Sequence, residues 1–288
     1  MSKNSDLVRV ENLNVSFPGH NKTVKAVRGL SFSVGRERVG IVGESGSGKS
    51  LTGRAILRLI RPPGIMTADK IEFDGIDLQS LTEKQMRDIR GHKISMVMQD
   101  PKYSLNPVQR VGDQIAEAYR VHNKTSKREA KQRALKMLEA VQIRDPERVY
   151  NTYPHEVSGG MGQRIMIAMM LVPEPDLLIA DEPTSALDVT VQLQVLGVMD
   201  KLVREKGMGL IFISHDLNLV ASFCDRVIIM YAGRIVETLN ASDLHNAKHP
   251  YTRGLLNSLP RIDQRTDKLI ALKRDPAWLD EESVDAFA

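Results

Sequence analysis

The sequence predicts an α/β fold with a parallel sheet, an antiparallel β edge and an inserted helical subdomain. Apolar runs of strand length alternate with helical patterns before residue 99, and the same alternation returns after residue 157. Between them, from Gln99 to about Tyr153, the pattern is helical. We therefore expect a core assembled from two segments of the chain, with the helical subdomain between them.

The first core segment contains a glycine-rich loop between a predicted strand at residues 39–42 and a predicted helix that includes Leu51 and continues to residue 57. The loop is Gly43-Glu44-Ser45-Gly46-Ser47-Gly48-Lys49-Ser50. Its glycines let backbone N–H groups converge on phosphate oxygens, Lys49 can span two terminal phosphates, and Ser50 can offer its hydroxyl to Mg²⁺. The dipole of the following helix favours the same anion. This arrangement predicts that the chain binds a nucleoside triphosphate.

Two carboxylates, Asp181 and Glu182, end the apolar run that predicts a strand at residues 177–181. Carboxylates at the end of a buried strand need a cation or a reaction to justify their burial. We expect Asp181 to hold Mg²⁺, directly or through water, and Glu182 to orient or deprotonate an attacking water. A solvated strand end followed by a turn is the alternative, which the phosphate-binding loop makes less favourable.

Two further features point to phosphate chemistry. Ser158, Gly159 and Gly160 precede a strongly apolar helical pattern, where a serine cap and two glycines would admit a phosphate to the helix N-terminus. A second anion site on one nucleotide-binding chain suggests that it serves the nucleotide of another subunit. His215 follows a predicted strand, and its place at the strand end favours a functional role over a buried core histidine.

The order of these motifs resembles that of the ATPase subunit of an ABC transporter, over nearly the whole chain. The resemblance implies a P-loop NTPase core of the ABC ATPase type. In this resemblance the Walker A motif is residues 43–50, the Q-loop glutamine is Gln99, the signature is residues 157–161, Walker B is residues 177–181 followed by catalytic Glu182, the D-loop is residues 185–188, and the switch histidine is His215. Phe17 stands where the family stacks an aromatic ring on adenine, although plain core packing is the alternative.

The resemblance also implies a mechanism. In the family, two ATPase subunits face each other head to tail, and each ATP lies between Walker A of one and the signature of the other. The implied catalytic residues are Glu182, His215, Gln99 and Lys49, and the implied Mg²⁺ ligands are Ser50, Gln99 and Asp181. The residues expected to hold ATP are Phe17, Gly43, Glu44, Ser45, Gly46, Ser47, Gly48, Lys49, Ser50, Leu51, Ser158, Gly159, Gly160 and Asp188.

Four segments follow from the positions of the motifs. We expect residues 1–98 to form the first part of the nucleotide-binding core, 99–157 the helical subdomain, 158–240 the second part of the core, and 241–288 a C-terminal extension. Residues 100–107 resemble a stretch that importers of peptides, opines and nickel place against a membrane partner. Residues 248–260 are similar to the tail of the same subfamily. They are stronger evidence for this subfamily than residues 100–107, because the core ABC motifs do not require such a tail.

Some positions depart from the family pattern. Val157 replaces the usual leucine and Met161 the common glutamine of the signature, while Ser158, Gly159 and Gly160 are intact. Di- and oligopeptide subunits of the subfamily often carry a cysteine-rich tail that resembles an iron–sulfur site. This chain has one cysteine, Cys224. We therefore expect neither an iron–sulfur cluster nor an internal disulfide, and we interpret Cys224 as a small buried hydrophobe.

Composition restricts the remaining possibilities. No apolar run approaches 18 residues and no apolar leader opens the chain, so we expect a protein that stays in the cytosol. The net charge of +4 is small for 288 residues and does not imply nucleic acid. The basic residues between positions 120 and 136 share a helical pattern with apolar ones, which predicts an amphipathic surface helix with a solvated basic face.

The sequence therefore predicts an ATP-hydrolysing subunit of an ABC importer for peptides or similar small solutes, with ATP and Mg²⁺ as cofactors. The resemblance adds a second ATPase, more often an unlike chain than a copy, two membrane permeases and an external binding protein, and it places the subunit at the cytoplasmic face of the membrane. The alternative is a soluble ABC ATPase that acts as a clamp on nucleic acid or ribosomes. Such proteins usually add a coiled coil or a second cassette, which this length does not accommodate.

Overall fold

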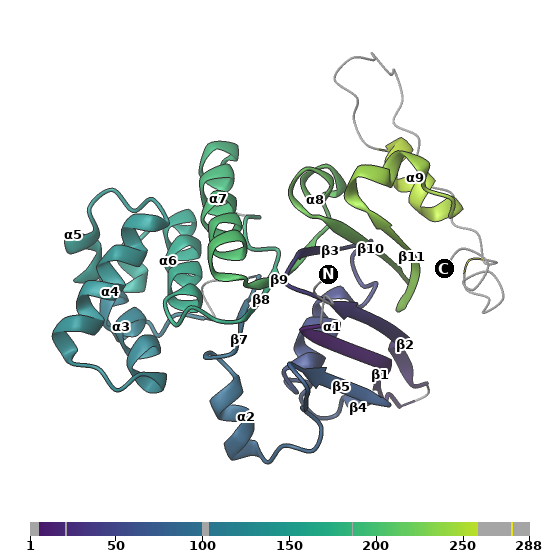
Figure 1. The fold of residues 1–288 in the computed structure, drawn as a ribbon, viewed down its shortest axis with the longest axis horizontal. Coiled ribbons are helices and arrows are strands. Elements are labelled where there is room, and N and C mark those ends of the chain that lie inside the picture. Colours follow the sequence, from purple (N-terminus) through teal and green to yellow (C-terminus); the bar gives the residue numbers. More distant parts are fainter. Residues whose placement is uncertain (1–5, 21, 100–103, 186, 259–277, 279–288) are drawn as a thin grey trace. The chain divides into compact units, whose positions relative to one another are not determined.

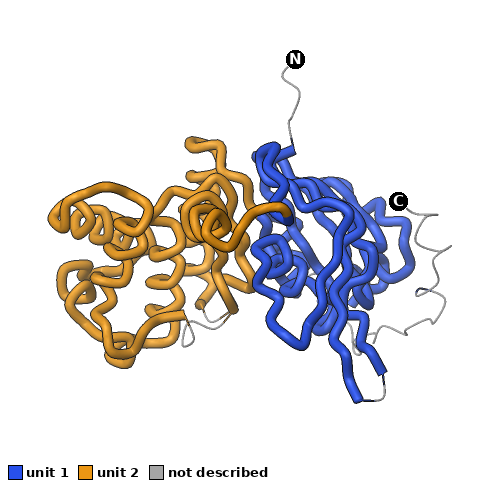
Figure 2. The backbone as a smooth tube through the Cα atoms, turned by 90° about the horizontal axis from the view of Figure 1, so that it is seen from below, with its two compact units in different colours: residues 1–79, 211–288 blue, residues 80–210 orange. Residues whose placement is uncertain are grey.

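The computed structural model describes residues 6–20, 22–99, 104–185, 187–258 and 278, and it divides the chain into two compact units. Unit 1 combines residues 1–79 with residues 211–288, and unit 2 is residues 80–210, as Figure 2 shows in two colours. The four segments expected from the sequence have other boundaries, and that division stays a prediction. No helix in the described part of the chain is both long and apolar enough to cross a membrane.

Unit 1 contains an antiparallel sheet. Its strands are β1 (Val8–Phe17), β2 (Val24–Val34), β4 (Ile65–Thr67), β5 (Lys70–Phe73) and β6 (Ile76–Asp77). They are ordered β2-β1-β5-β6, and β4 also pairs with β1. Along β1, Val8 and Val10 are buried as alternate residues, and after a shift in register Leu13 and Val15 continue the alternation. The antiparallel β edge expected from the sequence is thereby confirmed.

Parallel strands lie next to the phosphate-binding loop in unit 1. Strand β3 (Arg38–Val42) pairs in parallel with β10 (Arg226–Tyr231), which pairs in turn with the antiparallel β11 (Arg234–Asn240). Four of the five residues of β3 are buried, as is typical of a parallel strand covered on both faces. The helices of unit 1 are α1 (Lys49–Ile56), α8 (Leu217–Phe223) and α9 (Pro250–Ser258), and the short helix η3 spans Ala241–Asn246.

Unit 2 combines a second parallel strand pair with a group of helices. Strand β7 (Ile94–Val97) pairs in parallel with β8 (Leu177–Asp181). The helices are α2 (Glu83–Ile89), α3 (Val111–His122), α4 (Lys127–Ala140), α5 (Pro146–Tyr150), η2 (Pro154–Glu156), α6 (Gly159–Leu171) and α7 (Val189–Lys206). Helices α3, α4 and α6 contact one another and form the helical part of the unit in Figure 1. Strand β9 (Gly209–Ser214) carries the chain from unit 2 into unit 1.

Helix α4 is the amphipathic helix that the basic stretch predicts. Ala130, Ala134 and Leu138 are fully buried on one face of it. Ser126 caps its N-terminus by accepting a hydrogen bond from the backbone N–H of Glu129 at 3.2 Å. The lysines and arginines occupy the remaining, largely solvated positions of the helix.

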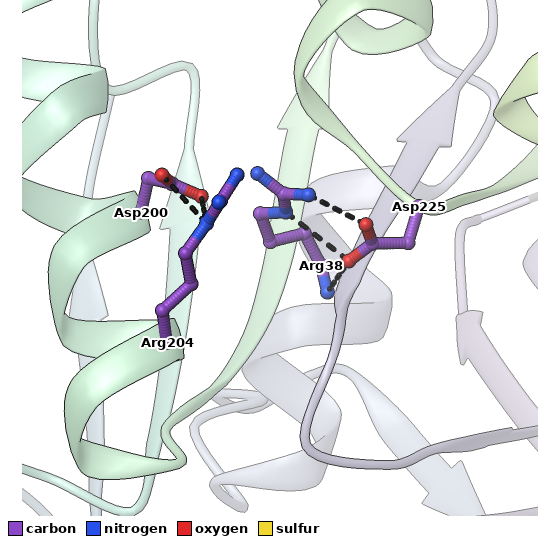
Figure 3. A network of polar contacts seen from close by, with 4 residues as sticks. All are labelled: Arg38, Asp200, Arg204 and Asp225. Carbon is purple, nitrogen blue, oxygen red and sulfur yellow. Dashed lines mark hydrogen bonds and ion pairs between the residues drawn. The ribbon is translucent and has the colours of Figure 1, made fainter.

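A bidentate ion pair fixes the start of the parallel pair in unit 1. Nε and Nη2 of Arg38 donate to the two carboxylate oxygens of Asp225 at 3.1 and 2.5 Å, and the backbone N–H of Arg38 donates to Oδ2 at 2.9 Å (Figure 3). Asp225 directly precedes β10, so these contacts hold the first residues of β3 and β10 in register. Asp200 and Arg204 on α7 form a simpler exposed pair one helical turn apart, at 3.0 Å.

Cys224 lies between α8 and β10 with 6 % of its surface exposed. Burial raises the pKa of the Cys224 thiol to about 12. The thiol is therefore protonated at neutral pH and packs as a small apolar group.

Candidate nucleotide site

The phosphate loop, residues 43–50, connects β3 to α1. Its backbone enters the left-handed region at Gly46, with φ of 82°, and at Gly48, with φ of 97°. Gly48 is also the N-cap of α1. A Cβ atom at Gly48 would lie 2.6 Å from the carbonyl oxygen of Ala26, which is closer than real contacts allow. A side chain would therefore add backbone strain at both positions, and at Gly48 it would also clash with the Ala26 carbonyl oxygen.

Lys49 is folded over the phosphate loop and is only 6 % exposed. Its Nζ donates to the carbonyl oxygens of Gly43 at 2.7 Å and Glu44 at 2.8 Å. The backbone N–H of Ser47 donates to the Glu44 oxygen as well, at 3.2 Å. A buried ammonium at the N-terminus of α1 adds its charge to the positive end of the helix dipole, which suits a phosphate.

The two predicted carboxylates lie at the end of β8 in unit 2. Asp181 is 1 % exposed, and Glu182 has φ of 48°, a left-handed conformation that is uncommon for residues other than glycine. Nε2 of Gln99 donates to the Glu182 carboxylate at 3.0 Å. The structure therefore brings together two of the predicted catalytic residues, which are far apart in the sequence.

Gln163 is a neighbour of this group that sequence reasoning did not assign to the site. It is completely buried on α6, and its Nε2 donates to the carbonyl oxygen of Glu182 at 3.3 Å. Ser185 Oγ donates to the same oxygen at 3.2 Å. These two bonds hold the strained peptide of Glu182. A long amide side chain beside the apolar run that makes up most of the helix was the signal in the sequence, since a buried amide needs hydrogen-bond partners.

The signature residues form an exposed helix N-terminus. Ser158 Oγ accepts a hydrogen bond from the backbone N–H of Met161 at 3.3 Å and caps α6, as the sequence predicts. Ser158 and Gly159 are exposed, and no described atom would come within 4 Å of a Cβ atom on Gly159. The N-terminus of α6 is thus open to the approach of an anion.

Asp188 has a structural contact that the sequence did not predict. It is the N-cap of α7, and its carboxylate accepts from the backbone N–H of Val191 at 3.0 Å. Ala186 of the predicted D-loop lies outside the described residues. Asp100, Pro101, Lys102 and Tyr103, which begin the stretch similar to that of peptide importers, also lie outside them.

The predicted site residues fall into two groups, one in each unit. Unit 1 carries Phe17, the phosphate loop with Leu51, and His215, while unit 2 carries Gln99, Asp181, Glu182, the signature residues and Asp188. Phe17 is half-buried at the end of β1, and His215 is exposed directly after β9.

The residues predicted for Mg²⁺ have suitable chemistry. Ser50, Gln99 and Asp181 offer hydroxyl, amide and carboxylate oxygens, which are the donors that Mg²⁺ prefers. Among the described residues there is no cluster of three or more histidine, cysteine, aspartate or glutamate side chains that could hold a metal ion. Such a donor set fits an ion that completes its shell with substrate phosphate oxygens and water.

Two protein families match the sequence. Residues 27–185 match the family described as ABC transporter, and residues 236–284 match the family described as oligopeptide/dipeptide transporter, C-terminal region. The first match includes the phosphate loop, both carboxylates and the signature. The second begins within β11 and includes α9.

Curated relatives and solved structures agree with these matches. The chain is 48 % identical over 287 residues to the oligopeptide transport ATP-binding protein OppD of Bacillus subtilis, covering 98 % of this chain and 80 % of the relative. It is 47 % identical over 268 residues to the dipeptide transport ATP-binding protein DppD of Escherichia coli, covering 92 % and 82 %. A dimeric ATP-binding cassette in a post-hydrolysis state, bound to ADP and Pi, has a TM-score of 0.75 at 27 % identity, over 81 % of this chain and 98 % of the cassette.

Alanine substitutions in the phosphate loop test the role of its backbone. Gly46→Ala should lower the free energy of unfolding by about 1 to 2 kcal/mol, because it adds strain at positive φ without a clash. Gly48→Ala should cost more, since it combines the strain with the contact to the Ala26 oxygen. Urea denaturation of the full chain measures both.

Gly159→Ala is the matched control, because its added methyl group meets open space at a helix N-terminus. It should leave the free energy of unfolding nearly unchanged. Equal stability of the Gly48→Ala and Gly159→Ala variants would contradict this account of the loop.

Proposed function

The chain belongs to the ABC transporter family of ATP-hydrolysing proteins, and from this membership we propose that it energises the import of peptides or related small solutes. The observation that supports the peptide assignment is the match of residues 236–284 to the C-terminal region of oligopeptide and dipeptide transporters. The relatives OppD and DppD carry peptide transport in their names. A clamp that acts on nucleic acid or ribosomes has no comparable support.

The phosphate loop is the ATP-binding element of the proposal. Lys49 exchanges the carbonyl oxygens of Gly43 and Glu44 for phosphate oxygens, and the N–H groups of the loop and of the first turn of α1 surround the same phosphates. Phe17 stacks against adenine. Ser50, Gln99 and Asp181 would hold Mg²⁺, which would neutralise charge on the phosphate oxygens.

Hydrolysis is assigned to Glu182, which accepts a proton from the attacking water or orients it. Gln163 and Ser185 hold the left-handed backbone from which the Glu182 side chain extends. Gln99 binds the carboxylate itself in the described structure, and it would have to leave Glu182 in order to contact Mg²⁺ or the attacking water. His215 holds the γ-phosphate in line with the water.

The signature acts on the nucleotide of a second ATPase subunit, more often an unlike chain. Ser158, Gly159 and Gly160 grip its γ-phosphate, and Asp188 lies at the same subunit interface. The exposed N-terminus of α6 supports this role because it is open to an anion from outside the chain. The pair of ATPases docks on two membrane permeases at the cytoplasmic face of the membrane, and an external binding protein delivers the solute.

The substitution Glu182→Gln tests the assignment of the catalytic base. Hydrolysis should fall by about 10²- to 10⁴-fold, because the amide cannot accept the proton, while ATP should still bind. Phosphate release and equilibrium ATP binding measure the two effects. Glu139→Gln on the exposed face of α4 is the matched control and should hydrolyse ATP at the wild-type rate. A Glu182→Gln variant with more than a tenth of wild-type activity would remove Glu182 from this role.

The importer assignment is tested by capture of partners from native membranes. Glu182→Gln with ATP and Mg²⁺ should trap the closed ATPase pair, and detergent extraction followed by mass spectrometry should identify two permeases and a second ATPase. Recovery of nucleic acid or ribosomal proteins without a membrane protein would favour the clamp alternative and leave the ATPase activity intact. Peptide-stimulated ATP hydrolysis by the same complex assembled with the wild-type chain would distinguish peptides from opines, nickel and glycosides.

A further inference from the structure

We propose that Tyr251 of the C-terminal extension is a positioning residue that holds the phosphate loop ready for nucleotide. This inference rests on the proposed function, because it concerns the same ATP site. The backbone N–H of Glu44, the second residue of the loop, donates a hydrogen bond to Tyr251 Oη at 3.0 Å. The contact joins two elements of unit 1 that are 207 positions apart in the sequence.

The ring of Tyr251 is held in place by its surroundings. Tyr251 is completely buried at the start of α9. Its ring centroid lies 4.5 Å from that of Tyr231, the last residue of β10, and 5.9 Å from that of Trp278. Packing against aromatic rings on two sides restricts the side chain, so its hydroxyl keeps one position.

The backbone that leads into α9 is fixed by a buried carboxylate. Glu237 on β11 is 2 % exposed and accepts hydrogen bonds from the backbone N–H groups of Lys248 at 2.6 Å and His249 at 3.3 Å. Nδ1 of His249 accepts from the backbone N–H of Tyr251 at 3.1 Å. Burial lowers the pKa of His249, although Glu237 opposes this effect, and the neutral ring is the form that can accept this bond.

The phosphate loop is therefore held from two directions at Glu44. Its carbonyl oxygen accepts from Lys49 Nζ and from the Ser47 N–H, both within the loop, and its N–H is bound by Tyr251 from outside the loop. A loop that is already ordered loses less conformational freedom when phosphate binds, so the affinity is higher. The Glu44 N–H and the Gly43 carbonyl oxygen belong to the same peptide unit. When Lys49 exchanges this oxygen for phosphate, the Tyr251 bond still holds the Gly43–Glu44 peptide in its orientation.

The substitution Tyr251→Phe in the full chain removes the hydroxyl and keeps the ring. ATP and ADP should bind about three- to tenfold more weakly, the change expected for one hydrogen bond of ordinary strength. Amide hydrogen exchange in the absence of nucleotide should become faster in a peptide that covers residues 43–50. If Tyr251 contributed only to packing, Tyr251→Phe would leave both nucleotide affinity and loop exchange unchanged. The phenylalanine ring keeps the contacts with Tyr231 and Trp278.

Tyr231→Phe is the matched control, since it removes the hydroxyl of a neighbouring buried tyrosine and keeps the ring that contacts Tyr251 and Trp278. It should leave nucleotide affinity and loop exchange as in the wild type. Glu237→Gln is the second test, should Tyr251→Phe fold poorly. It places an amide where the backbone N–H groups of residues 248 and 249 need acceptors, and it should shift both readouts in the same direction as Tyr251→Phe.

Unchanged affinity together with unchanged loop exchange in Tyr251→Phe would overturn the inference. Equal effects of Tyr251→Phe and Tyr231→Phe would overturn it too, because they would show a general response of the aromatic cluster. The exchange readout needs no nucleotide. Failure of the wild type to bind ATP would therefore refute the proposed function, while loop exchange would still decide on the Tyr251 contact.

Discussion

The hydrogen bonds of the Lys49 ammonium to the carbonyl oxygens of Gly43 and Glu44 are the interaction on which the nucleotide site depends. A nearly buried cation is tolerated only when acceptors compensate for the loss of water. The loop supplies them because its backbone turns through left-handed conformations at Gly46 and Gly48. The glycines of the loop and the charge of Lys49 therefore depend on each other. The ammonium needs oxygen acceptors, which are carbonyl oxygens in the free protein and phosphate oxygens in the complex.

The features that the sequence predicted well are those with a local pattern. Residues 43–50 contain the glycines, lysine and serine in consecutive order, and the capping role of Ser158 needs only the three residues that follow it. The buried strand end at Asp181 is equally local, because an apolar run stops at a carboxylate. Each of these features is determined by residues that are neighbours in the sequence, so the local sequence pattern was enough to predict it.

The contacts that were missed join distant segments. Tyr251 lies in a stretch whose similarity to importer tails is visible in the sequence, but no pattern links it to the N–H of Glu44. The bond from Gln163 to the left-handed backbone of Glu182 likewise joins α6 to the residue after β8, which follows Gln163 by 19 positions. The family resemblance gave Gln99 and Glu182 separate roles and did not predict the hydrogen bond between them. The roles of these residues in hydrolysis, and the four-segment division of the chain, stay predictions.

Equilibrium binding of ATP to Lys49→Ala tests the central claim most directly, with Lys22→Ala at an exposed position as the control. Loss of a charged hydrogen-bond donor should weaken binding by about 10- to 100-fold, whereas the control should bind as the wild type does. Wild-type affinity in Lys49→Ala would show that the ammonium does not hold phosphate, and it would contradict the account of the loop as the ATP site.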